Sequence, residues 1–269
     1  MSSRIDQVFQ NLKKDGRKAF VAYVCGGDPD PRTSLEILRG LARAGADIIE
    51  VGVPFSDPMA DGIVNQLAAE RALKAGMSVT GILDLVRKFR EVEDTPIVIF
   101  TYLNPIYAFG YERFHHEAAA AGADGILLLD LPPEEAESNA ELAHGVGLQH
   151  VQLISPTTPA TRLEMLAKAA SGFVYALSRT GVTGAHGAPA ASVGRLVKEI
   201  KTHTETPVCV GFGINTADQA REIAAQADGI IVGSAIVKMI AGLGAVPDLG
   251  TQIENFVRPL ADAAHEAGN

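Results

Sequence analysis

The sequence predicts a single (β/α)8 TIM barrel over residues 1–269, with an N-terminal helix and extra helices after strands two and eight. Three observations predict this fold. The length of 269 residues suits one α/β barrel, which typically has about 250 residues. Eight short apolar segments are each followed by a helical pattern, and a junction of small residues ending in aspartate recurs before three of them.

The eight apolar segments are continuously apolar, as expected of strands that are buried on both faces of a parallel sheet. They are residues 19–24, 48–51, 96–100, 125–129, 149–154, 173–177, 208–211 and 229–232. Eight consecutive βα units close into a barrel. An open doubly wound sheet is the alternative, but it would need a composition break or a Gly-x-Gly-x-x-Gly turn after the first strand, and the sequence has neither.

The recurring junction reads Ala-Gly-Ala-Asp at residues 44–47 and 121–124, and Ala-Asp at residues 227–228. Each copy lies between a helical pattern and a strand, which indicates a repeated βα unit. Residues 2–14 have the apolar spacing of an amphipathic helix, which we expect to close the bottom of the barrel. The extra helices are expected over residues 60–75 and 234–240.

The composition excludes several classes of function. A net charge of −9 argues against nucleic acid or an anionic membrane as the main partner. The two cysteines, Cys25 and Cys209, lie in or just after apolar segments and indicate buried thiols in a reduced, cytoplasmic compartment. We find no signal peptide and no apolar run of membrane-spanning length. No pair among the seven histidines has the spacing of metal ligands, so no metal is expected.

The most informative stretch is residues 48–62, where Glu50 interrupts an apolar strand and Asp61 ends a loop stiffened by Pro54 and Pro58. A carboxylate among isoleucines and valines costs free energy unless it is paired or protonated. Two carboxyl groups in such different environments predict an acid/base pair facing a cleft. The alternative is a Glu50 bonded to backbone amides and an Asp61 that caps the helix starting near Ala60.

In a barrel of this kind the chemistry lies at the carboxyl ends of the strands. Aromatic side chains gather at or near these ends, although aromatic residues make up only 6% of the sequence. They predict a pocket for a flat apolar group; for Phe100, packing in the barrel core is an equal alternative. The residues at these ends include Tyr23, Phe100, Tyr102, Ile154, Tyr175 and Phe212. Asp130, at the end of strand four, could contact substrate or cap the helix that begins near Glu134.

Three glycine-bearing segments follow strands six, seven and eight, at residues 181–187, 211–213 and 233–234. Glycine lets the backbone approach a ligand closely, and a helix opening at Ser234 would offer free amides and a positive dipole end. Loops after strands seven and eight with such a helix form a recurrent phosphate site in barrels. The alternative is that the glycines only form tight turns.

The motifs at these positions resemble those of the tryptophan synthase alpha subunit family. The sequence Glu-Val-Gly-Val-Pro-Phe-Ser-Asp-Pro at residues 50–58, with Ala-Asp-Gly at 60–62, resembles that family's signature. Residues 178–184 resemble its mobile loop six, and residues 211–214 and 233–237 resemble its phosphate segments. The resemblance runs from the first helix to the last.

The resemblance implies a lyase that cleaves indole-3-glycerol phosphate, by a retro-aldol reaction, to indole and glyceraldehyde 3-phosphate. Glu50 would be the general acid/base that protonates indole C3, and Asp61 would accept a hydrogen bond from the indole nitrogen while staying ionised. Aromatic and aliphatic side chains would hold the indole. Thr183 would close over the site with Asp57 as its partner. Gly184, Gly213, Gly233 and Ser234 would hold the phosphate through their amides, and Gly211 would also bind the substrate.

The resemblance also implies a partner, a pyridoxal-phosphate beta subunit in an αββα heterotetramer that receives the indole directly, so this chain would need no cofactor. The loop 54–61, Asn104, Pro105 and Pro132 would lie near that partner. A stand-alone lyase and a weakly catalytic activator of the beta subunit are the alternatives. The sequence departs from the family at Ile63, Cys25-Gly26 and His186-Gly187. These departures bear on loop closure and coupling to the partner and leave the acid/base pair intact.

Overall fold

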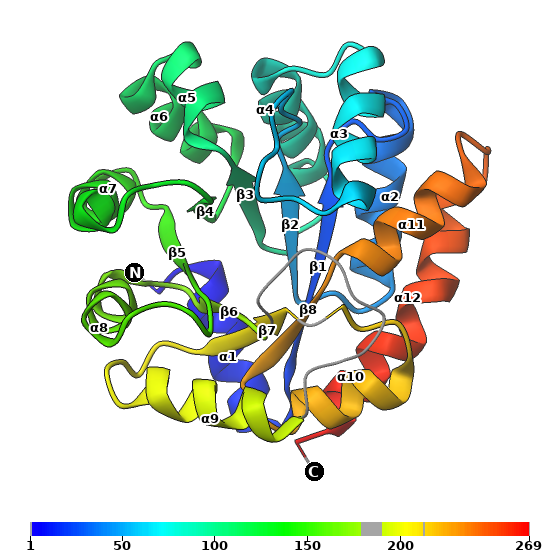
Figure 1. Cartoon of the computed structure of the whole chain (residues 1–269). Helices are drawn as coiled ribbons and strands as arrows, with labels where there is room; N and C mark the ends of the chain where they lie inside the picture. The colour runs from blue at the N-terminus through cyan, green and yellow to red at the C-terminus, as the bar shows by residue number, and fades with distance from the viewer. Residues whose placement is uncertain (1, 179–189, 212, 269) are drawn as a thin grey trace.

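The computed structural model, which describes residues 2–178, 190–211 and 213–268, is a closed barrel of parallel strands surrounded by helices (Figure 1). The strands follow one another around the barrel in chain order, and β1 pairs with β8 to close it. They are β1 Ala19–Cys25, β2 Ile48–Gly52, β3 Ile97–Thr101, β4 Gly125–Leu128, β5 Gln149–Ile154, β6 Val174–Leu177, β7 Val208–Gly211 and β8 Gly229–Val232. The predicted fold is confirmed, and each strand begins and ends within one residue of the apolar segment that predicts it.

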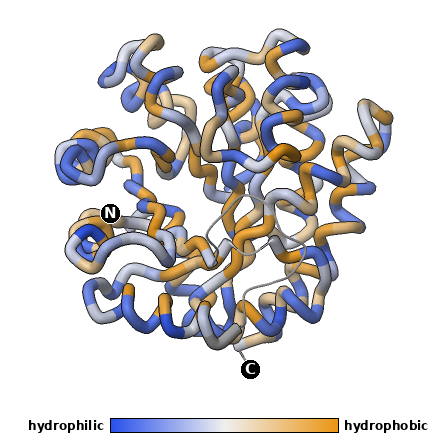
Figure 2. The backbone as a smooth tube through the Cα atoms, in the orientation of Figure 1, coloured by the Kyte–Doolittle hydropathy of each residue, from blue (hydrophilic) through white to orange (hydrophobic). Residues whose placement is uncertain are grey.

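Helices cover the outside of the barrel, and Figure 2 shows apolar residues along the strands beneath them. The helices are α1 Arg4–Lys14, α2 Pro31–Arg43, α3 Ile63–Lys74, α4 Val79–Arg90, α5 Leu103–Phe109, α6 Tyr111–Ala121, η1 Pro133–Glu135, α7 Ala136–Gly145, α8 Ala160–Ala169, α9 Ala190–Lys201, α10 Ala217–Ala224, α11 Ser234–Leu243 and α12 Leu249–Glu266. The extra helices after strands two and eight are confirmed as α3 and α11. The first begins at Ile63 rather than near residue 60, because residues 53–62 form a loop.

The N-terminal helix closes the bottom of the barrel, as its apolar spacing predicts. Ile5, Phe9 and Leu12 of α1 are buried in the same cluster as the inward-facing side chains of the strands, and the Phe9 ring lies 6.2 Å from that of Phe173. Ser3 caps the helix by accepting a hydrogen bond from the Asp6 amide, and the Asp6 carboxylate accepts one from the Ser3 amide. The open end of the barrel is therefore the end where the strands finish.

The recurring aspartates have one structural role. Each accepts a hydrogen bond from a backbone N–H at the start of the preceding strand, and each is also bound to a basic side chain. The amide bonds run from Phe20 to Asp47 at 2.7 Å, from Ile97 to Asp124 at 2.8 Å and from Val208 to Asp228 at 2.7 Å. The basic partners are His265 for Asp47, Arg4 and Arg90 for Asp124, and Lys201 for Asp228. The repeat thus joins neighbouring strands at the bottom of the barrel.

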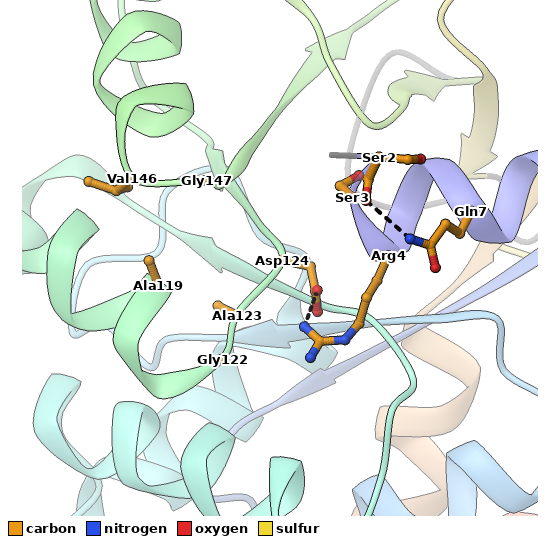
Figure 3. Close-up of a pocket in the computed structure, with 10 residues that line it drawn as sticks. All are labelled: Ser2, Ser3, Arg4, Gln7, Ala119, Gly122, Ala123, Asp124, Val146 and Gly147. Carbon is orange, nitrogen blue, oxygen red and sulfur yellow. Dashed lines mark hydrogen bonds and ion pairs between the residues drawn. The ribbon is translucent and has the colours of Figure 1, made fainter.

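Figure 3 shows the second of these aspartates, with Arg4 reaching from α1 to Asp124 at 2.9 Å beside a cavity of about 400 Å³. A second cavity, of about 500 Å³, is lined by Phe9, Lys18 and Asp228, among others. Both cavities lie at the bottom of the barrel. Active sites of this fold lie at the opposite end, where the strands finish, so neither cavity is a candidate for the catalytic site.

Replacing Asp124 with alanine should destabilise the fold by about 3 kcal/mol, because it leaves Arg90 and the Ile97 amide without their buried partner. The Asp124 side chain is only 4% exposed and the Arg90 side chain 13%. Urea denaturation measures the loss. Asp218→Ala is the matched control: Asp218 is 98% exposed in its ion pair with Arg221, so its loss should cost less than about 0.5 kcal/mol. Equal costs for the two variants would contradict this account.

Candidate active site

Glu50 lies in the middle of β2, opposite Tyr23 of β1 and Val98 of β3 in the strand register. Its side chain is fully buried, and both carboxyl oxygens are without a hydrogen-bond partner among the described residues. Burial alone raises the pKa of Glu50 to about 8. The alternative in which backbone amides satisfy this carboxyl is therefore wrong, and Glu50 is protonated at neutral pH.

Aromatic rings surround this carboxyl group. Tyr23 and Phe100 meet edge to face with ring centroids 5.1 Å apart, and Phe100 lies 6.5 Å from Tyr175. Glycines on neighbouring strands make room for the tyrosines. A Cβ at Gly52 would lie 2.6 Å from the Tyr23 hydroxyl, and one at Gly211 would lie 2.5 Å from the Tyr175 hydroxyl. These rings form one continuous apolar wall, as the pocket predicted from the sequence requires.

Asp61 lies in the loop after β2 and is held from two sides. The Tyr102 hydroxyl donates a hydrogen bond of 2.9 Å to Asp61 Oδ2, and the Asn65 amide approaches Asp61 Oδ1 at 3.4 Å. Partial burial raises the pKa of Asp61, while these two hydrogen bonds act in the opposite direction. From the sequence, Asp61 is expected to stay ionised because it lies in a loop. The structure shows that this loop position is partly buried. The helix-capping alternative is wrong, because Gly62 is the N-cap of α3.

The two carboxyl groups face the same tyrosines. Negative charge on either Glu50 or Asp61 raises the pKa of Tyr23 and of Tyr175, in addition to the larger effect of burial on each tyrosine. Glu50 and Asp61 therefore share one electrostatic environment at the open end of the barrel. Glu50 has no hydrogen-bond donor among the described residues, whereas Asp61 has two that partly offset the effect of burial on its pKa, so the two carboxyl groups lie in different environments.

Tyr102 has a role that the sequence did not reveal. The sequence predicts that Tyr102 binds substrate, and this stays a prediction. The structure adds that the Tyr102 hydroxyl donates to Asp61 and accepts a hydrogen bond of 3.0 Å from the Ala60 amide. Its ring lies 5.4 Å from that of Phe55 in the same loop. Tyr102 therefore fixes the loop that carries Asp61. A sequence separation of 41 residues offers no local pattern from which this contact could be predicted.

Tyr102→Phe should lower kcat about 10-fold, because it removes one hydrogen bond to Asp61 but keeps the ring packed against Phe55. Steady-state kinetics of the wild type and the variant measure the change. Tyr111→Phe is the control, since the Tyr111 hydroxyl donates to Asn139 and is outside this network. A Tyr102→Phe enzyme as active as the control would show that this hydrogen bond has no catalytic value.

The glycine segments that the structure describes lie at the ends of β7 and β8. Gly213 has a φ of 65° and is exposed, and Gly233 is the N-cap of α11, whose first residue, Ser234, is exposed. The first amides of α11 have no intrahelical acceptor, so they are free to donate to an anion, and the phosphate site stays a prediction. The remaining residues predicted for this part of the site, Phe212, Thr183 and Gly184, lie outside the described residues.

The other predicted residues occupy different surroundings. Ile154 is fully buried and packs among the residues between the barrel and its helices, whereas Val151 faces the barrel interior. Asp57, Asn104 and Pro132 are exposed, and Pro105 is half-buried. Asp130 accepts a hydrogen bond of 2.6 Å from the Leu103 amide. It therefore caps the start of α5 rather than the helix near Glu134, which is the position considered from the sequence.

The described residues contain no group of three or more histidine, cysteine, aspartate or glutamate side chains that could hold a metal ion. Cys25 and Cys209 are buried free thiols, and burial raises the pKa of both. Within the same part of the chain, no helix is both long enough and apolar enough to cross a membrane.

Comparisons with known proteins agree with this geometry. The family model of the tryptophan synthase alpha chain matches residues 9–265. A tryptophan synthase alpha chain from Opitutus terrae is 48% identical over 238 residues, which are 88% of this chain and 90% of that protein.

Solved structures agree as well. The crystal structure of tryptophan synthase subunit alpha from Legionella pneumophila has a TM-score of 0.90 at 35% identity, covering 98% of this chain and 99% of that one. A structure of Mycobacterium tuberculosis tryptophan synthase has a TM-score of 0.89 at 35% identity, with the same coverage of 98% and 99%. This chain therefore belongs to the tryptophan synthase alpha chain family and is a lyase of tryptophan synthesis.

Proposed function

We propose that this chain cleaves indole-3-glycerol phosphate to indole and glyceraldehyde 3-phosphate by a retro-aldol reaction. The observation that carries the proposal is the fully buried Glu50 carboxyl, whose two oxygens have no partner among the described residues. A carboxylic acid kept neutral by burial is a proton donor at neutral pH. Breaking the carbon–carbon bond requires such a donor, because the indole ring leaves only after its C3 carbon has gained a proton.

The reaction proceeds in two proton transfers on Glu50. The acid first protonates indole C3, and positive charge develops on the ring and its nitrogen. Asp61 accepts a hydrogen bond from the indole N–H and stabilises this charge. The Glu50 carboxylate then takes the proton of the hydroxyl on the carbon attached to C3. That oxygen becomes the aldehyde, the carbon–carbon bond breaks, and its electron pair restores the aromatic indole, so Glu50 ends protonated as it began.

The remaining groups bind the substrate. Tyr23, Phe100 and Tyr175 supply the apolar wall for the indole ring. Gly213, Gly233 and Ser234 would hold the phosphate, with the first amides of α11, which begins at Ser234, among the donors. The acid/base pair performs the chemistry without a cofactor. Cleavage of a cytoplasmic metabolite also fits the reduced compartment predicted from the two free cysteines.

A beta subunit that contains pyridoxal phosphate and receives the indole is the partner that we propose. Large apolar side chains are exposed on the loop after β2 and on the helices beside it: Met59 is 91% exposed, Ile63 56% and Tyr107 62%. Exposed apolar residues near the open end of the barrel suit a protein interface. Asp57 and Asn104, which are expected near the partner, are also exposed. Asp57 lies on the loop after β2, and Asn104 lies on α5.

The test is the release of indole from indole-3-glycerol phosphate by the purified chain, alone and with a beta subunit added. We expect slow cleavage that rises steeply when the partner is present. Fast cleavage that the partner leaves unchanged would indicate the stand-alone lyase. Absence of cleavage under both conditions would contradict the proposal and favour a chain that only activates the beta subunit.

A further inference from the structure

Asp28, which is buried, and Arg71, whose side chain is 33% exposed, form an ion pair that the chemistry described above does not use. Arg71 Nε donates to Asp28 Oδ1 at 2.7 Å, and Arg71 Nη2 donates to Asp28 Oδ2 at 2.8 Å. The ion pair is therefore bidentate. Asp28 is 1% exposed and lies in the loop between β1 and α2, whereas Arg71 lies in the last turn of α3. Burial raises the pKa of Asp28, and its bonds to Arg71 oppose that rise.

Helix α3 contributes mainly small side chains to the core, with the partly buried Val64 beside them. Its buried side chains are Ala68, Ala69 and Ala72, and Leu67 and Leu73 on the same helix are exposed. Three alanine methyl groups bury little apolar area. Among the described residues, Arg71–Asp28 is the one ion pair that joins α3 to another element. The ion pair therefore gives α3 a directional contact with the rest of the barrel, which the packing of alanine side chains does not provide.

The other end of α3 holds the catalytic loop. The Gln66 side chain donates to the Asp61 carbonyl oxygen at 2.8 Å, and the Asn65 amide approaches the Asp61 carboxylate at 3.4 Å. Helix α3 also packs against β1, which carries Tyr23, and against α11, which begins at Ser234. Figure 1 shows α3 beside α11 at the open end of the barrel. A shift of α3 would therefore move Asp61 relative to both neighbours.

We propose that the Arg71–Asp28 ion pair positions Asp61 for catalysis, by fixing α3 and, through Asn65 and Gln66, the loop that carries the Asp61 carboxylate. Arg71 is thus a positioning residue that never touches the substrate. The inference rests on the proposed function for its kinetic consequences. It also makes a claim about the loop itself, which holds whatever the substrate is.

The kinetic test compares Arg71→Gln with Lys74→Gln. Lys74 lies on the same helix, is 73% exposed and pairs only with Glu70 of its own helix, so it is a matched control. Arg71→Gln should lower kcat about 30-fold with less than about a threefold change in KM, because misplaced catalytic groups slow chemistry more than they weaken binding. Lys74→Gln should stay within about twofold of the wild type. Wild-type kcat in Arg71→Gln would overturn the proposal.

A double-mutant cycle separates positioning from general structural damage. If Arg71 acts through Asp61, then Arg71→Gln should change kcat by less than about threefold in an Asp61→Asn background, since the group that it positions is already disabled. The same loss of about 30-fold in both backgrounds would overturn the proposal. Asp28→Asn/Arg71→Gln leaves no unpaired buried charge and serves for these measurements if Arg71→Gln alone fails to fold.

Hydrogen exchange tests the inference without any assay of activity. The backbone amides of residues 57–66 should exchange faster in Arg71→Gln than in the wild type, while Lys74→Gln should match the wild type. Unchanged exchange in Arg71→Gln would overturn the inference. If the wild type fails to cleave indole-3-glycerol phosphate, the proposed function fails, and this experiment still decides whether the ion pair holds the loop.

Discussion

Glu50→Gln should lower kcat for the cleavage of indole-3-glycerol phosphate by about 10³-fold or more, because glutamine keeps the shape of the side chain but has no proton to transfer. No other described side chain is placed to take over, since the groups nearest to Glu50 are tyrosines whose pKa is raised further by burial. Single-turnover measurement of indole release, with the beta subunit present, gives the rate. A variant that retained even a tenth of wild-type activity would contradict the role of Glu50.

The same substitution should stabilise the protein, which excludes unfolding as the reason for lost activity. A carboxyl whose pKa rises from 4.5 in the unfolded chain to about 8 in the fold binds its proton more tightly when folded. The stability of the wild type therefore falls as pH rises from about 4.5 to 8, and that of Glu50→Gln does not. At pH 7 the variant should be more stable by about 3 kcal/mol in urea denaturation, and near pH 4 the difference should vanish.

Asp61→Asn should lower kcat by about 10²- to 10³-fold, because it removes the negative charge that stabilises the developing positive charge of the indole ring. The loss should appear in kcat more than in KM, since the substrate carries that charge only in the transition state. The neutral amide can still accept a hydrogen bond from Tyr102 in place of the carboxylate. The folded structure should therefore remain intact.

Asn65→Ala provides the control for Asp61→Asn. It removes a weak contact of 3.4 Å with the same carboxylate but leaves the charge in place. We expect less than about a 10-fold loss in kcat for this variant. If Asp61→Asn lost no more activity than Asn65→Ala, the charge of Asp61 would not contribute to catalysis.

The fold could be predicted from the sequence because its signals are local. A parallel strand that is buried on both faces must be apolar along its whole length, so each of the eight strands is visible in a window of a few residues. The repeated aspartates were visible for the same reason, but their role was not. The bond from Asp124 to the Ile97 amide joins residues that are far apart in the chain and meet only when the barrel closes.

The sequence was enough to select Glu50 and Asp61 as the candidate catalytic residues. It predicted the surroundings of their carboxyl groups only in part. Glu50 is marked by its apolar neighbours in the same strand, and these neighbours cause the burial that raises its pKa. The hydrogen bond that Asp61 accepts comes from Tyr102, 41 residues further along the chain, and could not be inferred from the loop of Asp61. Arg71 and Asp28, 43 residues apart, were missed because each fits an ordinary local role, in a helix and in a turn.

The ionisation of Glu50 in the ligand-free protein tests the central claim most directly. Carboxyl ¹³C NMR of selectively labelled glutamate, compared between the wild type and Glu50→Gln across pH 4 to 9, isolates the signal of this one residue. Because Glu50 is fully buried and its oxygens are unpartnered among the described residues, its carboxyl should titrate with a midpoint near 8. A midpoint near 4.5 would show that Glu50 is ionised at neutral pH and is not the proton donor of the reaction.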